Sequence, residues 1–413
     1  MRNFSLKLAG ETGVRLFSAL FIFVLARNVG AASFGLYSTA FAFASLFGIL
    51  IDLGTNPIIT RDIARDPAGR DKLLGSATFL KTIAAIAALV SIDQLGRWFD
   101  IARDHRWLVD GLGVVVAGYN LIDYFAALLT GKEEMGWEAF VKAACRAVIA
   151  LAGIAAIYAT HALSPVVSVM ATASLASLAL GAAVVGSRFG GFHWRFDAQV
   201  LRKLMGSSLP LLGSVVFWIF YDNQDILLLH HFRRPERDIG LFWSASKVID
   251  VCKVAPALLA GAFFPTMARF SAVRESFLQI SRTLLGYTLL VVPLVVAALY
   301  GAAPRLEVAL YGPDFAQAAP LLQRLLLAYA AIFINYICTQ ILIAKDHEKK
   351  LLAGAALACL ANLGFTWWLI PIQGTMGVCN ALIMSEMLYL AFQIRLVVLA
   401  VPALFNPFRT TFG

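Results

Sequence analysis

Charged residues are scarce in this chain, and their scarcity argues against a soluble globular protein. Aspartate, glutamate, lysine and arginine make up 14% of the 413 residues, whereas hydrophobic residues make up 60% and the mean hydropathy is +0.77. A soluble domain has about a quarter of its residues charged. The composition therefore predicts a polytopic membrane protein.

Cysteines and nucleotide-binding signatures are also sparse. The Gly-x-x-x-x-Gly-Lys-Ser/Thr phosphate loop is missing, which excludes ATP hydrolysis by that route, and we expect no cofactor. The basic residues behind the net charge of +9 are scattered between apolar runs, which argues against a nucleic-acid partner. We expect neither a disulfide framework nor a metal site, because the five cysteines lie in apolar segments without paired spacing: Cys145, Cys252, Cys338, Cys359 and Cys379.

Twelve apolar segments are long enough to cross a membrane. A hydrocarbon core of about 30 Å requires about 20 mostly apolar residues in a helix. The first segment carries Glu11 and Arg15 and has no small-residue cleavage site, so we expect it to stay in the membrane. The sequence predicts an all-α protein with about twelve transmembrane helices, at residues 6–26, 36–57, 72–92, 107–130, 138–158, 163–186, 205–231, 239–263, 282–302, 316–341, 351–370 and 375–399.

The distribution of lysine and arginine predicts the orientation. With the N-terminus in the cytoplasm, the inner loops and tails carry eighteen of these residues and the outer loops carry eight. Because cytoplasmic loops are enriched in lysine and arginine, we expect both termini in the cytoplasm. Two expected outer loops, DQLGRWFDIARDHR at 93–106 and HHFRRPERDIG at 230–240, carry more arginine than this rule predicts.

Two similar stretches indicate a duplicated architecture. Residues 34–65 (FGLYSTAF…DIAR) and 239–269 (IGLFWSAS…TMAR) begin with an apolar residue, glycine, leucine and an aromatic residue, and both end in Ala-Arg. Each would be the second span of a six-helix half. We therefore predict two pseudo-symmetric six-helix lobes around a central polar cavity, with limits at 1–186 and 205–401, a cytoplasmic linker at 187–204 and a short cytoplasmic tail at 402–413.

Several motifs, taken in order, resemble a known family. They are LARNVGAASFGLYSTAFAF at the first turn, LIDLGTNPIITRDIAR, LRKLMGSSLPLLG, IGLFWSASKVID and WWLIPIQGTMGVCNALIMSEM. Together they are similar to the polysaccharide-repeat-unit flippases, the O-antigen and exopolysaccharide translocases of the multidrug/oligosaccharidyl-lipid/polysaccharide superfamily. One departure is the charge on the eighth span, where the family usually has small residues and this chain has Lys247, Asp250 and Lys253.

The resemblance implies a transporter, not an enzyme. Its expected substrate is an undecaprenyl-pyrophosphate-linked oligosaccharide, moved from the cytoplasmic to the outer leaflet of a bacterial inner membrane by alternating access. Membrane lipids, a polysaccharide polymerase and chain-length machinery are the expected partners. Pro256 and Pro293 are candidate hinges, because proline removes a helical hydrogen bond.

Ionisable residues inside spans are the candidate site, because they are costly in lipid and usually face the interior of a bundle. Those at helical spacing should share a face, as at Glu11 and Arg15 or at Lys142 and Arg146. For the pyrophosphate and glycan the candidates are Arg15, Lys81, Arg146, Lys247, Lys253 and Arg324; for ion coupling they are Asp222, Asp225, Asp250 and Glu386.

Each candidate also has a structural alternative in an ordinary salt bridge. Lys81 could pair with Asp123 instead of lining a cavity, and Asp52 is expected to pair with arginines of the inner loops. Lys142 is expected to extend its amine to the membrane surface. In WIFYDNQDILLLHHF at 218–232, the two aspartates could form an ion-paired patch with the lysines of the next span or couple an ion.

Two other functions remain open. A multidrug exporter of the same superfamily would share the architecture, although such exporters usually favour an acidic cavity and the intramembrane charges here have both signs. A membrane-embedded glycan polymerase or ligase would have a similar number of spans. Such enzymes tend to carry one long outer loop with catalytic residues, and this sequence has no such loop.

Overall fold

The computed structural model describes residues 2–66, 69–101, 103–191, 195–270, 273–345 and 347–404. In these ranges the chain is almost entirely helical and contains no strand. The first elements are α1 (Arg2–Asp52), α2 (Asn56–Arg65), α3 (Arg70–Trp98), η1 (Arg103–His105), α4 (Arg106–Gly131), α5 (Met135–Thr160), α6 (Leu163–Phe189) and α7 (Ala198–His231). They are followed by α8 (Glu236–Cys252), α9 (Val254–Arg269), α10 (Arg274–Tyr311), η2 (Pro313–Ala318), α11 (Ala319–Ile343), α12 (Glu348–Gln373), α13 (Thr375–Ala400) and η3 (Pro402–Leu404).

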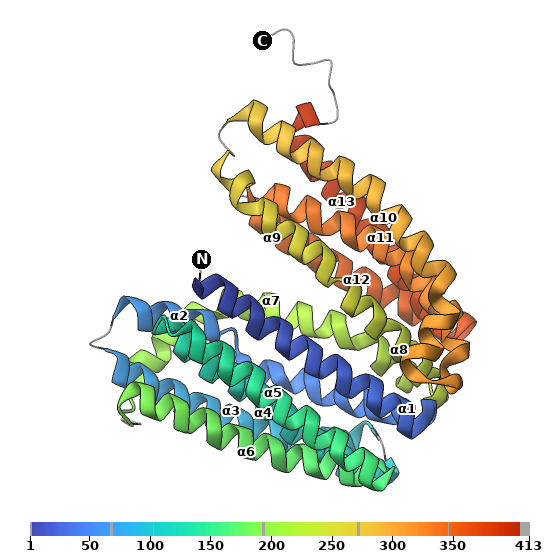
Figure 1. Ribbon diagram of the computed structural model, residues 1–413. Helices are drawn as coiled ribbons and strands as arrows, with labels where there is room; N and C mark the ends of the chain where they lie inside the picture. The colour runs from blue at the N-terminus through green and yellow to red at the C-terminus, as the bar shows by residue number, and fades with distance from the viewer. Residues whose placement is uncertain are drawn as a thin grey trace. The chain divides into compact units, whose positions relative to one another are not determined.

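The helices form two compact units, residues 1–227 and 228–413. In the first, α1 packs mainly on α5, while α6 packs on α4 and α5 (Figure 1). In the second, α13 packs on α11 and α12, and α10 packs on α11. The division falls inside α7, downstream of the predicted linker, and the predicted lobe limits stay a prediction. Residues 192–194 of that linker and 405–413 of the predicted tail lie outside the described residues.

The prediction of an all-α polytopic membrane fold is confirmed. Among the described residues, ten helices are long and apolar enough to cross a membrane, or eleven if the bent helix α7 counts as one span. The remaining difference from twelve lies in α1, which contains the first two predicted spans. Gly30, with φ 76° and ψ 169°, interrupts its helical geometry, and Figure 1 shows α1 turning back on itself.

Prolines explain two further departures from straight helices. The predicted span 239–263 is broken at Lys253 into α8 and α9, and Pro256 lies in the first turn of α9. Proline at 256 has no N–H for the carbonyl of Cys252, which instead accepts a hydrogen bond from the Tyr329 hydroxyl at 2.9 Å.

In α10, a side chain likewise supplies the hydrogen bond that a proline cannot donate. Pro304 deprives the Tyr300 carbonyl of its helical partner, and Gln323 Nε2 donates to that oxygen at 3.1 Å. Both proline sites are thereby tied to α11. The predicted hinge roles of Pro256 and Pro293 stay predictions.

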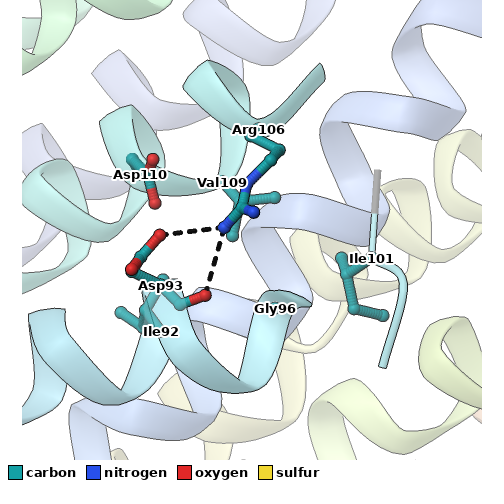
Figure 2. Close-up of a pocket in the computed structure, with 7 residues that line it drawn as sticks. All are labelled: Ile92, Asp93, Gly96, Ile101, Arg106, Val109 and Asp110. Carbon is teal, nitrogen blue, oxygen red and sulfur yellow. Dashed lines mark hydrogen bonds and ion pairs between the residues drawn. The ribbon is translucent and has the colours of Figure 1, made fainter. Parts of the chain in front are cut away.

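Three of the six arginines in the two arginine-rich loops bind groups within the protein. Asp93, at the end of α3, accepts hydrogen bonds from Arg97 Nη2 at 2.8 Å and from Arg106 Nη2 at 2.9 Å, beside a small pocket shown in Figure 2. In the second loop, the guanidinium of Arg234 donates to the carbonyls of Ile370 and Pro371, near the C-terminus of α12. These three arginines therefore serve local structure, and the predicted orientation of the termini stays a prediction.

Lys81 closes the C-terminal end of α1. Its ammonium donates to the carbonyl of Ile51 at 2.7 Å and to that of Asp52 at 2.9 Å, and it lies 3.9 Å from the Asp52 carboxylate. The side chain is 1% exposed. Asp52 therefore pairs with Lys81, not with the inner-loop arginines that we expected.

The turn after Asp52 requires glycine. Leu53 and Gly54 both have positive φ, at 50° and 65°, and a Cβ on Gly54 would lie 2.7 Å from the backbone nitrogen of Leu212. The Asp-Leu-Gly turn therefore lets α7 approach the end of α1 closely.

Glu134, in the turn between α4 and α5, binds the end of α6. It accepts two hydrogen bonds from Arg188, to Oε2 at 2.6 Å and to Oε1 at 3.1 Å, and lies 3.2 Å from Lys132 Nζ. The hydrogen bonds from Arg188, and then those from Lys132, lower the pKa of Glu134 below its usual range. This contact fixes the end of α6 against the α4–α5 turn.

We predict that Lys81→Met lowers the free energy of unfolding by about 2–3 kcal/mol, because two buried carbonyls lose a charged donor while the volume is kept. Thermal unfolding of the purified protein in detergent measures the change. The matched control is Lys72→Met, which removes an exposed lysine paired with Asp197 at 3.0 Å and should leave Tm nearly unchanged. Equal Tm values for Lys81→Met and wild type would contradict the capping role.

The Glu134 contact should give a pH-dependent contribution to stability. The pKa of Glu134 is lower in the folded protein than in the unfolded chain, where it is about 4.3. The carboxylate therefore contributes its full stabilisation at pH values above about 4.3, and this contribution is lost as pH falls through the folded-state pKa. We expect Glu134→Gln to lower Tm at pH 7 and the difference from wild type to shrink on acidification. The exposed neighbour supplies the control, since Glu133→Gln should show no such trend. A difference that grew toward acid pH would refute this reading.

Candidate functional site

The first unit contains a group of charged side chains on three helices, which we call the N-terminal polar cluster: Glu11 on α1, Tyr119 and Asp123 on α4, and Lys142 and Arg146 on α5. Lys142 forms an ion pair with Glu11 and lies 3.9 Å from the Asp123 carboxylate. Arg146 lies 3.8 Å from the same carboxylate, and its guanidinium sits 3.4 Å from the centre of the Tyr119 ring. Lys142 and Arg146, four residues apart, share one face of α5, as predicted.

The geometry of this cluster leaves its cations incompletely bound. Distances of 3.8 and 3.9 Å to Asp123 permit attraction but exceed the length of a direct hydrogen bond. Stacking on an aromatic face orients the guanidinium of Arg146 while its N–H groups lie in the plane of the group. An anion could therefore compete with Asp123 for both cations.

The structure shows the surroundings of three residues that the sequence analysis discussed, Lys142, Arg15 and Asp123. Lys142 does not extend to a membrane surface; it is drawn to Glu11 and Asp123, because pairing offsets the cost of a charge inside the bundle. Arg15 lies one turn after Glu11 and is exposed, with no ion pair in the part of the chain that the structure describes. Asp123 is the partner of the α5 cations, not the partner of Lys81.

The second unit contains the C-terminal polar cluster, formed by Trp243, Lys247, Asp250 and Lys253. Asp250 binds Lys247 at 2.7 Å and Lys253 at 2.9 Å, so the predicted face with a charge at every third residue is present. Lys247 also lies 5.4 Å from the centre of the Trp243 ring. Two cations and one carboxylate give the cluster a net charge of +1, and they meet at the α8–α9 break.

The other predicted site residues lie on α7, α11 and α13. Arg324 is exposed and donates to Asn380 at 3.3 Å, whereas Glu386 is 6% exposed and accepts from Asn335 at 2.8 Å. Asp222 and Asp225 lie on α7, the first exposed and the second half-buried. The pairing of Asp225 with Lys247 stays a prediction, as do the roles of all the predicted site residues.

Among the described residues, sequence reasoning missed two buried carboxylic acids, Glu138 on α5 and Glu307 on α10. We predicted that the ninth span ended at residue 302, which left Pro304, Arg305 and Glu307 outside it. The helix α10 instead continues to Tyr311, and the side chain of Glu307 is 0% exposed. The apolar residues of LEVALY after the proline were the signal that could have extended the span.

Comparisons with solved structures agree with the helical architecture. The chain is similar to an inward-facing multidrug resistance MATE family transporter of the MOP superfamily, with a TM-score of 0.75 and 15% identity over 97% of this chain and 96% of that one. It is similar to the lipid II flippase MurJ in an inward closed conformation, with a TM-score of 0.73 and 14% identity over 99% and 93%. The chain is also similar to a MOP superfamily transporter from Pyrococcus furiosus, with a TM-score of 0.61 and 16% identity over 97% of this chain and 94% of that one.

At such low identities these likenesses establish the fold alone. No curated protein matches the chain. A family model described as "Polysaccharide biosynthesis protein" matches residues 1–271, which is more than half of the sequence and includes the motifs that carried the resemblance up to the end of α9. The chain belongs to this polysaccharide biosynthesis protein family.

Proposed function

We propose that the protein moves undecaprenyl-pyrophosphate-linked oligosaccharide repeat units from the cytoplasmic to the outer leaflet of a bacterial inner membrane. The products would serve O-antigen, capsule or exopolysaccharide synthesis. Family membership over residues 1–271 is the observation that carries the proposal. The fold shared with MurJ, whose name describes a lipid II flippase, supports it.

The two polar clusters supply chemistry suited to such a head group. A pyrophosphate and its sugars cannot cross hydrocarbon unaided, because their polar atoms would lose their hydrogen bonds. In this proposal Lys142 and Arg146, held weakly by Asp123, exchange that carboxylate for phosphate oxygens. Lys247 and Lys253 offer a second positive region, and exposed Arg15 and Arg324 extend the two regions.

Transport would proceed by alternating access of two lobes around a central polar cavity, with both termini in the cytoplasm. Asp222, Asp225, Asp250 and Glu386 are the proposed ion-coupling groups. The substrate role predicted for Lys81 stays a prediction, because its ammonium is bound to the end of α1. The lipid tail can stay in the bilayer throughout. A polymerase and chain-length machinery would act on the translocated repeat unit.

A multidrug exporter is the second candidate, because the MATE transporters share the fold. The charges of the N-terminal polar cluster favour the flippase. Two cations beside Asp123 and Glu11 are a poor receptor for cationic drugs, which need unpaired carboxylates. A membrane-embedded enzyme has less support, since the family and the structural neighbours are not described as enzymes.

Deletion of the gene tests the function directly. The lipid-linked repeat unit should accumulate on the cytoplasmic leaflet, and surface glycan should fall, in a strain without a redundant flippase. Expression of the wild-type chain should reverse both effects. Normal surface glycan without accumulation would rule the flippase out, and restored efflux of a cationic dye would favour the exporter.

We predict that Arg146→Ala reduces complementation of the deletion strain at least about tenfold, because one bidentate charged contact contributes about 1.5–3 kcal/mol and 1.4 kcal/mol equals a factor of ten. Arg146→Lys should retain part of the activity, since it keeps the charge but loses the fork. Lys253→Ala tests the C-terminal polar cluster in the same assay.

Arg97→Ala is the matched control for these variants. It removes the same side chain from an exposed pair with Asp93, which belongs to neither cluster, and should leave complementation unchanged. Surface glycan is measured at equal amounts of membrane-inserted protein. Full activity of Arg146→Ala, or an equal loss in Arg97→Ala, would remove Arg146 from the proposed site.

A further inference from the structure

The carboxyl group of Glu307 is the least satisfied ionisable group in the second unit. Its side chain is 0% exposed, and neither carboxyl oxygen has a partner in hydrogen-bond geometry among the described residues. An ionised carboxylate in such a place would lose its hydration without compensation, which costs several kcal/mol. The surroundings therefore fit the neutral acid.

The neighbouring hydroxyl groups reinforce this assignment. Ser244 lies beside the carboxyl, but its hydroxyl donates to the Leu241 carbonyl at 2.9 Å. Tyr311, one turn after Glu307, donates to the Ser244 carbonyl at 3.0 Å. Each hydroxyl has one proton and has already given it away, so Ser244 offers the carboxyl only a lone pair. A protonated Glu307 can donate to that lone pair, whereas a carboxylate cannot.

No cation offsets a charge on Glu307 among the described residues. Asp250 on α8 interacts electrostatically with Tyr311. Lys247 and Lys253 are both bound to Asp250. Tyr329 of α11 donates to the carbonyl of Cys252. The other charged groups on α10 and on the elements packed against it nearby are exposed, except for Asp238 on α8, which is half-buried. The exposed ones are Glu236 and Arg237 on α8, Arg269 on α9, Arg305 on α10, Asp314 on η2 and Arg324 on α11.

We propose that Glu307 is a proton-binding site of the second unit, held as a neutral carboxylic acid at neutral pH with its O–H directed to Ser244 Oγ. Binding adds one proton to the carboxylate and needs no other reactant. Because Ser244, which lies beside Glu307, precedes Lys247 by about one turn of α8, loss of this proton would place a second negative charge near the C-terminal polar cluster and cancel its net charge of +1.

This site would link proton occupancy to binding of an anion, a consequence that rests on the proposed function. A protonated Glu307 leaves Lys247 and Lys253 with their excess positive charge, which favours an anionic head group. Release of the proton favours release of the anion, and by reciprocity a bound anion strengthens proton binding. Glu307 is therefore a fifth candidate for proton coupling, in addition to the four acidic residues chosen from the sequence.

Infrared spectroscopy of the purified full chain in detergent tests the proton site without a transport assay. The wild-type spectrum minus the Glu307→Gln spectrum at pH 7 should contain the C=O stretching band of one protonated carboxylic acid, lost in the variant. The glutamine is neutral and of similar shape, so it should fold. Asp314→Asn, which removes an exposed carboxylate, should leave the band intact.

The outcomes separate this proposal from the proposed function. A missing band in the difference spectrum at pH 7 overturns the proton site, even if the deletion strain accumulates lipid-linked glycan. A band that is present supports the site, even if the deletion has no such phenotype. If Glu307→Gln does not yield folded protein, Ser244→Ala replaces it: loss of the acceptor should shift the band to higher frequency, and an unshifted band overturns the assignment.

Discussion

A backbone carbonyl without a partner is costly inside a membrane, where no water can replace the missing hydrogen bond. The helices of this protein contain several such carbonyls, and polar side chains supply the donors. Lys81 satisfies the end of α1, and Arg234 satisfies the end of α12. Tyr329 and Gln323 satisfy carbonyls released by Pro256 and Pro304. The breaks and ends of the helices depend on these contacts.

The same constraint separates structural charges from candidate functional ones. Lys81 and Arg234 are bound to carbonyls and have little freedom to bind a substrate. In the N-terminal polar cluster, Lys142 pairs with Glu11 and Arg146 stacks on Tyr119, but both cations lie beyond hydrogen-bond length from Asp123. Those of the C-terminal polar cluster share one aspartate. A mobile anion can displace a carboxylate from a cation more easily than it can displace the backbone carbonyls at the end of a helix.

Much of the fold could be predicted from the sequence, because hydrophobic length and helical spacing are local properties. The apolar runs located the spans, and spacing of three or four residues identified the faces at Lys142 and Arg146 and at Lys247 and Asp250. Partners across helices could not be predicted in this way. Spacing does not reveal that Asp123 faces α5 instead of Lys81, or that Lys81 reaches the end of α1. Glu307 was missed because proline usually ends a helix, whereas here Gln323 supplies the missing donor and α10 continues.

Leaflet-resolved transport in proteoliposomes tests the central claim most directly. The purified chain would be reconstituted with a fluorescent undecaprenyl-pyrophosphate oligosaccharide, and a membrane-impermeant quencher would report the fraction accessible on the outside. Active protein should equilibrate the lipid between leaflets much faster than protein-free vesicles, and Arg146→Ala should slow this exchange. Exchange no faster than in protein-free vesicles, with correctly inserted protein, would contradict the account.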